Sequence, residues 1–118
     1  MVVGLSAVPP GFDGRLDAVL AAGGELIWQA GPLEKGCGLC HGTAGNGYAF
    51  LELYRRTGDG KWLERARAFA MHAVAQWARM RARYGRGRYT LWTGDPGLAV
   101  YLWDCVRAEG ELPVLDVF

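Results

Sequence analysis

The spacing of apolar residues along the chain predicts four helices. Apolar side chains recur at steps of three and four residues over about 14–30, 44–57, 60–84 and 96–108, and this period is typical of helices. Segments that contain glycine or proline separate these stretches, and such segments end helices. The pattern therefore predicts an all-α fold.

The first of these helices has a clear start and a weak middle. Asp13 can cap its N-terminus, and Gly31 follows its last residue. Gly23 and Gly24 each weaken the helix by roughly 1 kcal/mol relative to alanine. We therefore expect this helix to depend on packing partners.

The two ends of the chain are predicted to be tails. Residues 1–12 show no period and contain Pro9 and Pro10, and residues 112–118 follow the last predicted helix. The predicted domain therefore covers residues 13–118, with residues 1–12 as an N-terminal tail.

The two central helices differ in where their apolar residues lie. The helix at 44–57 is apolar on nearly every side over its first ten residues, which predicts an interior helix surrounded by others. The helix at 60–84 has one apolar stripe and one polar stripe, which predicts an outer helix. Three of the five tryptophans are expected in the core, namely Trp62, Trp77 and Trp103. The polar stripe is expected to be solvated, and it consists of Arg65, His72, Gln76, Arg79 and Arg83.

The chain contains an internal repeat. When the sequence is shifted by 52 positions, Gly42 falls on Gly94 and Gly45 falls on Gly97. The residue after the first glycine of each loop, Thr43 or Asp95, is the predicted N-cap of the helix that follows. The repeating unit is a Gly-x-x-Gly loop, an interior helix, a turn and an outer helix. Such hairpins bury their apolar faces only by stacking, and the chain holds about two of them.

Composition narrows the class of protein. The 118 residues carry a net charge of +1, which gives no indication of nucleic acid as a partner. No apolar run is long enough to span a bilayer, and the first residues lack the basic region of a signal peptide. Three cysteines do not resemble a disulfide framework, so a reducing cytoplasm is the expected location.

The candidate chemistry lies in the glycine-rich loop at 36–47. Cys37, Cys40 and His41 fall within five residues, directly before the interior helix. Cysteine and histidine side chains are the ligands that zinc prefers. Two alternatives remain open, because Cys-x-x-Cys-His is also the attachment motif of c-type haem and Cys-x-x-Cys a redox dithiol.

A basic run follows the outer helix, and its members are Arg79, Arg81, Arg83, Arg86 and Arg88. We interpret this run as the solvated end of a helix, with contact to phosphate or to an acidic peptide as the alternative.

These motifs resemble those of the LanC-like proteins, relatives of the bacterial lanthionine cyclases. The resemblance is carried by the string KGCGLCHGTAGNGY at 35–48 and by the aromatic-x-Gly-x-x-Gly loop at 92–97, and it extends from about Ile27 to Phe118. It implies a toroid in which inner helices are surrounded by outer helices, of which this chain would form about two hairpins.

The resemblance also implies a zinc site and a reaction. Cys40 and His41 correspond to two zinc ligands, and the third ligand, a cysteine, would precede residue 1. Cys37 is a further candidate ligand. Gly42, Gly45, Gly94 and Gly97 would form the loops that line the substrate cavity.

The implied activity is the zinc-dependent addition of a thiol to dehydroamino acids in peptides or proteins, which forms a thioether. The thiol would be glutathione or a peptide cysteine. We expect this chain to be an incomplete and inactive part of such an enzyme. The alternative is a non-catalytic helical module that binds zinc, glutathione or a protein partner.

Overall fold

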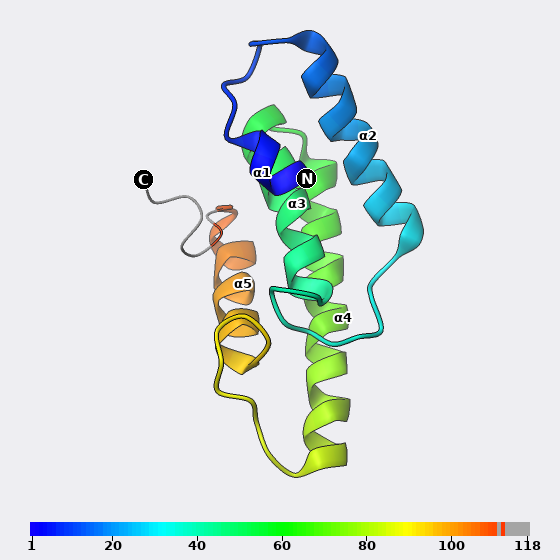
Figure 1. Cartoon of the computed structure of the whole chain (residues 1–118), viewed down its shortest axis with the longest axis vertical. Helices are drawn as coiled ribbons and strands as arrows, with labels where there is room; N and C mark the ends of the chain where they lie inside the picture. The colour runs from blue at the N-terminus through cyan, green and yellow to red at the C-terminus, as the bar shows by residue number, and fades with distance from the viewer. Residues whose placement is uncertain (111, 113–118) are drawn as a thin grey trace.

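The computed structural model of the chain describes residues 1–110 and 112. These residues form five α-helices. They are α1 (Val2–Ser6), α2 (Gly14–Ala30), α3 (Thr43–Thr57), α4 (Gly60–Tyr84) and α5 (Asp95–Arg107), and Figure 1 shows their arrangement. The described residues contain no strand, which confirms the all-α class. No helix among them is long and apolar enough to cross a membrane. The predicted C-terminal tail lies outside the described residues except for Leu112, which is buried.

Helix α3 is the interior element against which all the other helices pack. Its residues Tyr48, Phe50 and Leu51 are completely buried. The ring of Phe50 lies 4.9 Å from that of Phe69 and 6.1 Å from that of Trp62, both on α4. Helix α4 runs beside α3 and extends beyond its N-terminal end, with α2 and α5 on opposite sides (Figure 1). The predicted contrast between an interior and an outer helix is confirmed, and the arrangement is consistent with part of an α/α toroid.

The helix boundaries agree closely with the sequence prediction. Asp13 accepts a hydrogen bond from the Arg15 amide, and Asp59 accepts one from the Lys61 amide, so both carboxylates cap as predicted. The N-caps of α3 and α5 differ by one residue, because Gly42 and Gly94 occupy them instead of Thr43 and Asp95. Thr43 and Asp95 are therefore the first helical residues.

Residues 1–12 differ from the predicted tail because Val2–Ser6 form α1. The helix spans too few residues for a period to be visible in the sequence. Val2 and Ser6 are nonetheless buried, and Ser6 Oγ donates to the buried carboxylate of Glu52 on α3 at 3.0 Å. Burial against α3, and not helix propensity, holds this segment in place.

The paired glycines in α2 allow close helix packing. A Cβ atom at Gly24 would collide with Leu53 of α3 and with the Trp62 ring of α4, and one at Gly23 would lie 2.8 Å from Val2 Cγ2. The glycines thus lower helix propensity but let α2 approach three other helices. The expected dependence of α2 on packing partners has this physical basis.

Two predicted environments are wrong. Gln76 was expected in the solvated stripe but is 5% exposed, whereas Trp103 was expected in the core and is 59% exposed. Gln76 is buried because its amide hydrogen-bonds to groups from other segments. Such partners lie far away in the sequence and leave no trace in a helical period.

The internal repeat of the sequence is also a repeat of backbone contacts. The Thr43 amide donates to the Gly36 carbonyl at 2.9 Å, and the Asp95 amide donates to the Arg88 carbonyl at 2.7 Å. These two hydrogen bonds are related by the same shift of 52 positions. Each bond folds a loop back over the first turn of its helix.

A glycine inside each first turn makes this contact possible. A Cβ atom at Gly45 would collide with the Leu39 carbonyl oxygen, and one at Gly97 with the Leu91 carbonyl oxygen. The colliding atoms belong to the backbone, so neither can rotate away. Only glycine fits both positions.

We expect Gly45→Ala and Gly97→Ala each to lower the free energy of unfolding by about 1–3 kcal/mol or more, the usual cost of overpacking. The measurement is urea denaturation followed by circular dichroism. Gly60→Ala is the matched control, because a Cβ there meets nothing within 4 Å and alanine favours the helix. Equal stability of all three variants would contradict the packing described here.

The three cysteines are free and differ in exposure, with Cys37 and Cys105 buried and Cys40 exposed. Burial raises the pKa of the Cys105 thiol to about 11, and burial also raises the pKa of the Cys37 thiol above its ordinary value. A raised pKa keeps a thiol protonated at neutral pH, and the protonated form is a poor nucleophile.

We therefore expect iodoacetamide at pH 7.5 to alkylate Cys40 in the folded chain well before Cys37 or Cys105. Peptide mapping by mass spectrometry at successive times measures the three rates. Denaturation in urea is expected to make the rates similar. Faster labelling of Cys37 than of Cys40 in the folded chain would contradict the burial of the Cys37 thiol.

Candidate functional site

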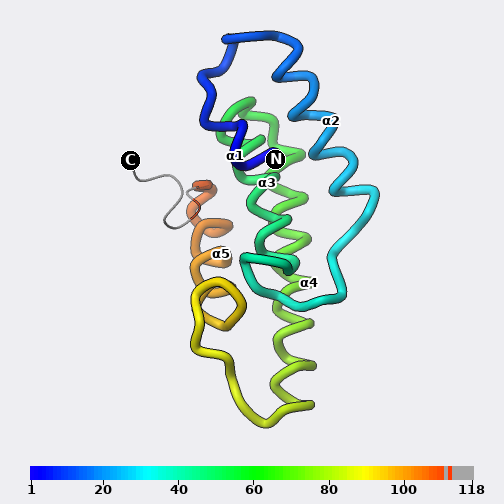
Figure 2. Tube along the Cα trace, viewed as in Figure 1, coloured from blue at the N-terminus to red at the C-terminus, as the bar shows by residue number. Residues whose placement is uncertain are grey.

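The candidate site lies where two loops meet beside α4 (Figure 1). The loop from α2 to α3 contains Cys37, Cys40 and His41, and the loop from α4 to α5 covers residues 85–94. Figure 2 shows the two loops approaching each other beside the N-termini of α3 and α5. The Cys40 amide donates to the Trp92 carbonyl at 2.8 Å, which joins the two repeats directly.

Gly38 brings the same two loops into backbone contact. A Cβ atom there would lie 3.0 Å from the Thr93 Cα atom and from the Trp92 carbonyl oxygen. The loop with the cysteines and the histidine is therefore held by the second repeat as well as by its own helix.

The predicted zinc ligands Cys40 and His41 are both exposed and directly precede the N-cap of α3. His41 lines a cavity of about 160 Å³ together with Arg88, Trp92 and Thr93. His41 therefore borders a space that residues of both loops line. An exposed thiol beside an exposed imidazole leaves both groups accessible to a metal ion or to a substrate.

A buried amide fixes the loop from the other side. Gln76 Nε2 on α4 donates to the Leu33 carbonyl at 2.6 Å, and Gln76 Oε1 accepts from Thr43 Oγ1 at 2.6 Å. One side chain thus connects the outer helix, the start of the loop and the start of α3. Sequence reasoning missed this residue. The sequence offers only a weak signal for its burial, namely a neutral amide among the arginines of the polar stripe.

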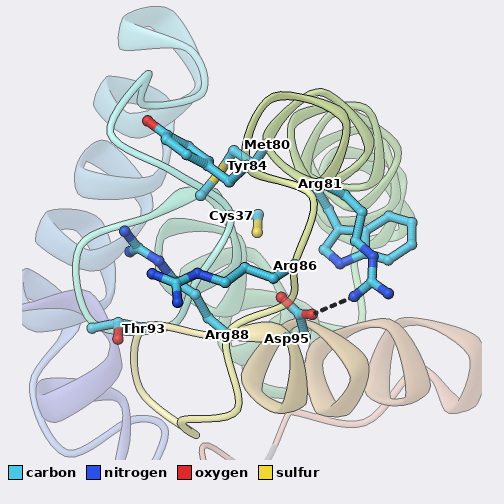
Figure 3. Close-up of a pocket in the computed structure, with 9 residues that line it drawn as sticks. Cys37, Met80, Arg81, Tyr84, Arg86, Arg88, Thr93 and Asp95 are labelled. Atoms are coloured by element: carbon cyan, nitrogen blue, oxygen red, sulfur yellow. Dashed lines mark ion pairs between the residues drawn. The ribbon is translucent and has the colours of Figure 1, made fainter.

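Cys37 lines a second cavity of about 200 Å³, which Figure 3 shows. It lines the His41 cavity as well. Arg81, Arg86, Arg88 and Asp95 surround its thiol, and Arg81 forms an ion pair with Asp95 at 3.9 Å. Desolvation raises the pKa of the Cys37 thiol, and the nearby Asp95 carboxylate raises it further. Cys37 therefore lies under the loop, unlike Cys40 and His41 on its surface.

The four predicted loop glycines share one kind of surroundings. Gly42, Gly45, Gly94 and Gly97 all lie against backbone carbonyl groups of their own loops. Gly42 also lines the cavity that contains His41. Close packing of the backbone is the visible reason for glycine at these four positions.

The donor set at this site fits part of a zinc centre. Catalytic zinc takes three protein ligands from cysteine, histidine and carboxylate side chains and leaves one position open. Cys40 and His41 are suitable in type and exposure. Within residues 1–110 and 112, no three such side chains are grouped so that they could hold a metal ion. Cys40 and His41 therefore stay two predicted ligands, and Cys37 stays a further candidate.

Comparison with known proteins connects this geometry with a family. A protein of Danio rerio named glutathione S-transferase LANCL1 is 42% identical over 95 residues, which cover 80% of this chain and 23% of that protein. LanC-like protein GCL1 of Arabidopsis thaliana is 43% identical over 98 residues, which cover 80% of this chain and 22% of that protein. The chain therefore spans less than a quarter of the length of these relatives.

The family comparison covers nearly all of the structure described above. The family model for lanthionine synthetase C-like proteins matches residues 15–110, from the start of α2 to the end of α5. The match includes both loops of the candidate site and both copies of the internal repeat. This chain belongs to the lanthionine synthetase C-like family.

Proposed function

We propose that the loop with Cys40 and His41 is part of an active site for zinc-dependent addition of a thiol to dehydroamino acids in peptides or proteins. Glutathione is the proposed thiol, supported by the name of the Danio rerio relative. In this reaction the thiol sulfur bonds to the β-carbon of the dehydroamino acid, and the α-carbon gains the proton. The cytoplasm is the proposed location, because glutathione and thioredoxin keep thiols reduced there.

Cys40 and His41 would hold the zinc ion through sulfur and a ring nitrogen. When bound, the zinc ion would act as a Lewis acid and favour the thiolate form of a bound thiol near neutral pH. A third ligand would come from outside the described residues, as the family resemblance implies. The 118-residue chain alone is thus proposed to bind zinc weakly and to show negligible turnover.

One observation supports this proposal above all others, namely the hydrogen bond from the Cys40 amide to the Trp92 carbonyl. It ties the Cys-His pair to the neighbouring repeat, so the pair sits on a fixed backbone and not on a free loop. Ligands that are held in place lose little conformational entropy when they bind a metal or substrate. Gln76 acts as a positioning residue by fixing both ends of the same segment.

We expect the purified chain to bind zinc with low affinity through Cys40 and His41. Cys40→Ala and His41→Ala should each reduce the bound zinc severalfold or more, because only one of the two donors remains. Equilibrium dialysis with metal analysis measures binding. The absorption of the cobalt-substituted chain tests for a bond to thiolate.

Cys37→Ala is the matched control, since it removes a buried thiol from the same loop and is expected to leave zinc binding unchanged. Circular dichroism would establish that all three variants remain helical. Zinc binding that survives Cys40→Ala but is lost in Cys37→Ala would contradict the proposed ligands. A folded chain without measurable zinc binding would favour the alternative, a helical module that binds its partner without metal.

A further inference from the structure

One side of α4 carries a stripe of basic residues next to the candidate site. His72, Arg79 and Arg83 are exposed, and their spacing with Gln76 follows one face of a helix. Gln76 lies beneath them and hydrogen-bonds to Leu33 at the start of the site loop. The stripe therefore borders the loop that contains Cys40 and His41.

This stripe forms one wall of a cavity with a volume of about 660 Å³. Lys35 and Arg88 from the two loops also line it, together with one acidic residue, Glu34. Lys35 and Arg88 line the His41 cavity as well. The basic cavity and the site therefore share part of their walls.

The positive charge in this region is not compensated by ion pairs, although Glu34 also lines the cavity. Among the described residues, Lys35, Arg79, Arg83 and Arg88 have no carboxylate oxygen within ion-pair distance. Elsewhere most arginines are paired, namely Arg15, Arg55, Arg56, Arg65, Arg81 and Arg107. The whole chain has a net charge of only +1, so this concentration is local and not a property of the composition.

We infer that the basic cavity binds anionic side chains of the peptide that accepts the thiol. This inference depends on the proposed function for the role of the peptide, and on the cavity alone for the binding of anions. Arginine binds carboxylate and phosphate groups through paired hydrogen bonds. Both groups offer the same chemistry here, because each presents two or more oxygens to a guanidinium.

The spacing of the arginines favours an extended peptide. Arg79 and Arg83 are separated by one turn, a rise of about 6 Å. Alternate side chains of an extended chain are about 6.6 Å apart. An acidic residue at every second position would therefore place one anion beside each arginine, with the intervening side chains directed away.

The test uses a fluorescein-labelled peptide of ten residues in which glutamate alternates with serine. Two further peptides replace glutamate by phosphoserine or by glutamine. We expect the glutamate or the phosphoserine peptide to bind the 118-residue chain, and the tighter of the two identifies the source of the anion. Binding is measured by fluorescence anisotropy and should weaken as salt is raised.

The decisive variant is Arg79→Gln with Arg83→Gln, which should weaken binding of the anionic peptide by about tenfold or more. The matched control is Arg15→Gln with Arg107→Gln, which also removes two positive charges but lies outside the cavity, and it should change binding less than about twofold. The inference is overturned if no anionic peptide binds, if the glutamine peptide binds equally well, or if both double variants weaken binding alike.

Zinc binding by the same samples separates this inference from the proposed function. The Arg79→Gln and Arg83→Gln double variant is expected to retain the zinc binding of the unmodified chain. Loss of peptide binding with zinc retained supports a separate anion site. Zinc binding without any peptide binding would reject only the inference, whereas peptide binding without zinc would reject only the metal centre.

Discussion

The structure depends on a close contact between backbones where α3 and α5 begin. Each helix is preceded by a loop whose carbonyl oxygen, that of Leu39 or Leu91, lies where a Cβ atom of the first helical turn would be. Glycine at positions 45 and 97 removes that obstacle. The loop can then accept the amide hydrogen bond of Thr43 or Asp95, so one small residue in each repeat determines how the loop folds.

The same contact determines where the chemically useful side chains lie. With its backbone held from both repeats, the first loop presents Cys40 and His41 on its surface and encloses Cys37 beneath it. The basic residues of α4 border this surface because Gln76 ties the outer helix to the loop. The basic cavity and the predicted metal ligands are thus neighbours through the packing of one segment.

The sequence predicted the helices well, since caps such as Asp13 and Asp59 act locally and the apolar period of α3 and α4 is long. The repeat of glycines also predicted that α3 and α5 begin alike. Other features depend on contacts that no local pattern reveals. Val2 is ordered by α3, Gln76 is buried by partners from other segments, and Trp103 is exposed although its helix is apolar. At the candidate site, residue types predicted Cys40 and His41, whereas the contacts of Trp92 and Arg88 with the same loop required the fold.

Amide hydrogen exchange, followed residue by residue by NMR, tests the backbone contact most directly. The account predicts strong protection of the Cys40, Thr43 and Asp95 amides, because each donates to a carbonyl of a loop and can exchange only when that loop opens. The amide of Tyr89, a residue that is 82% exposed in the loop from α4 to α5, serves as the reference for rapid exchange. Exchange of Cys40, Thr43 and Asp95 as fast as that of Tyr89, in a chain whose α3 core amides remain protected, would contradict the account.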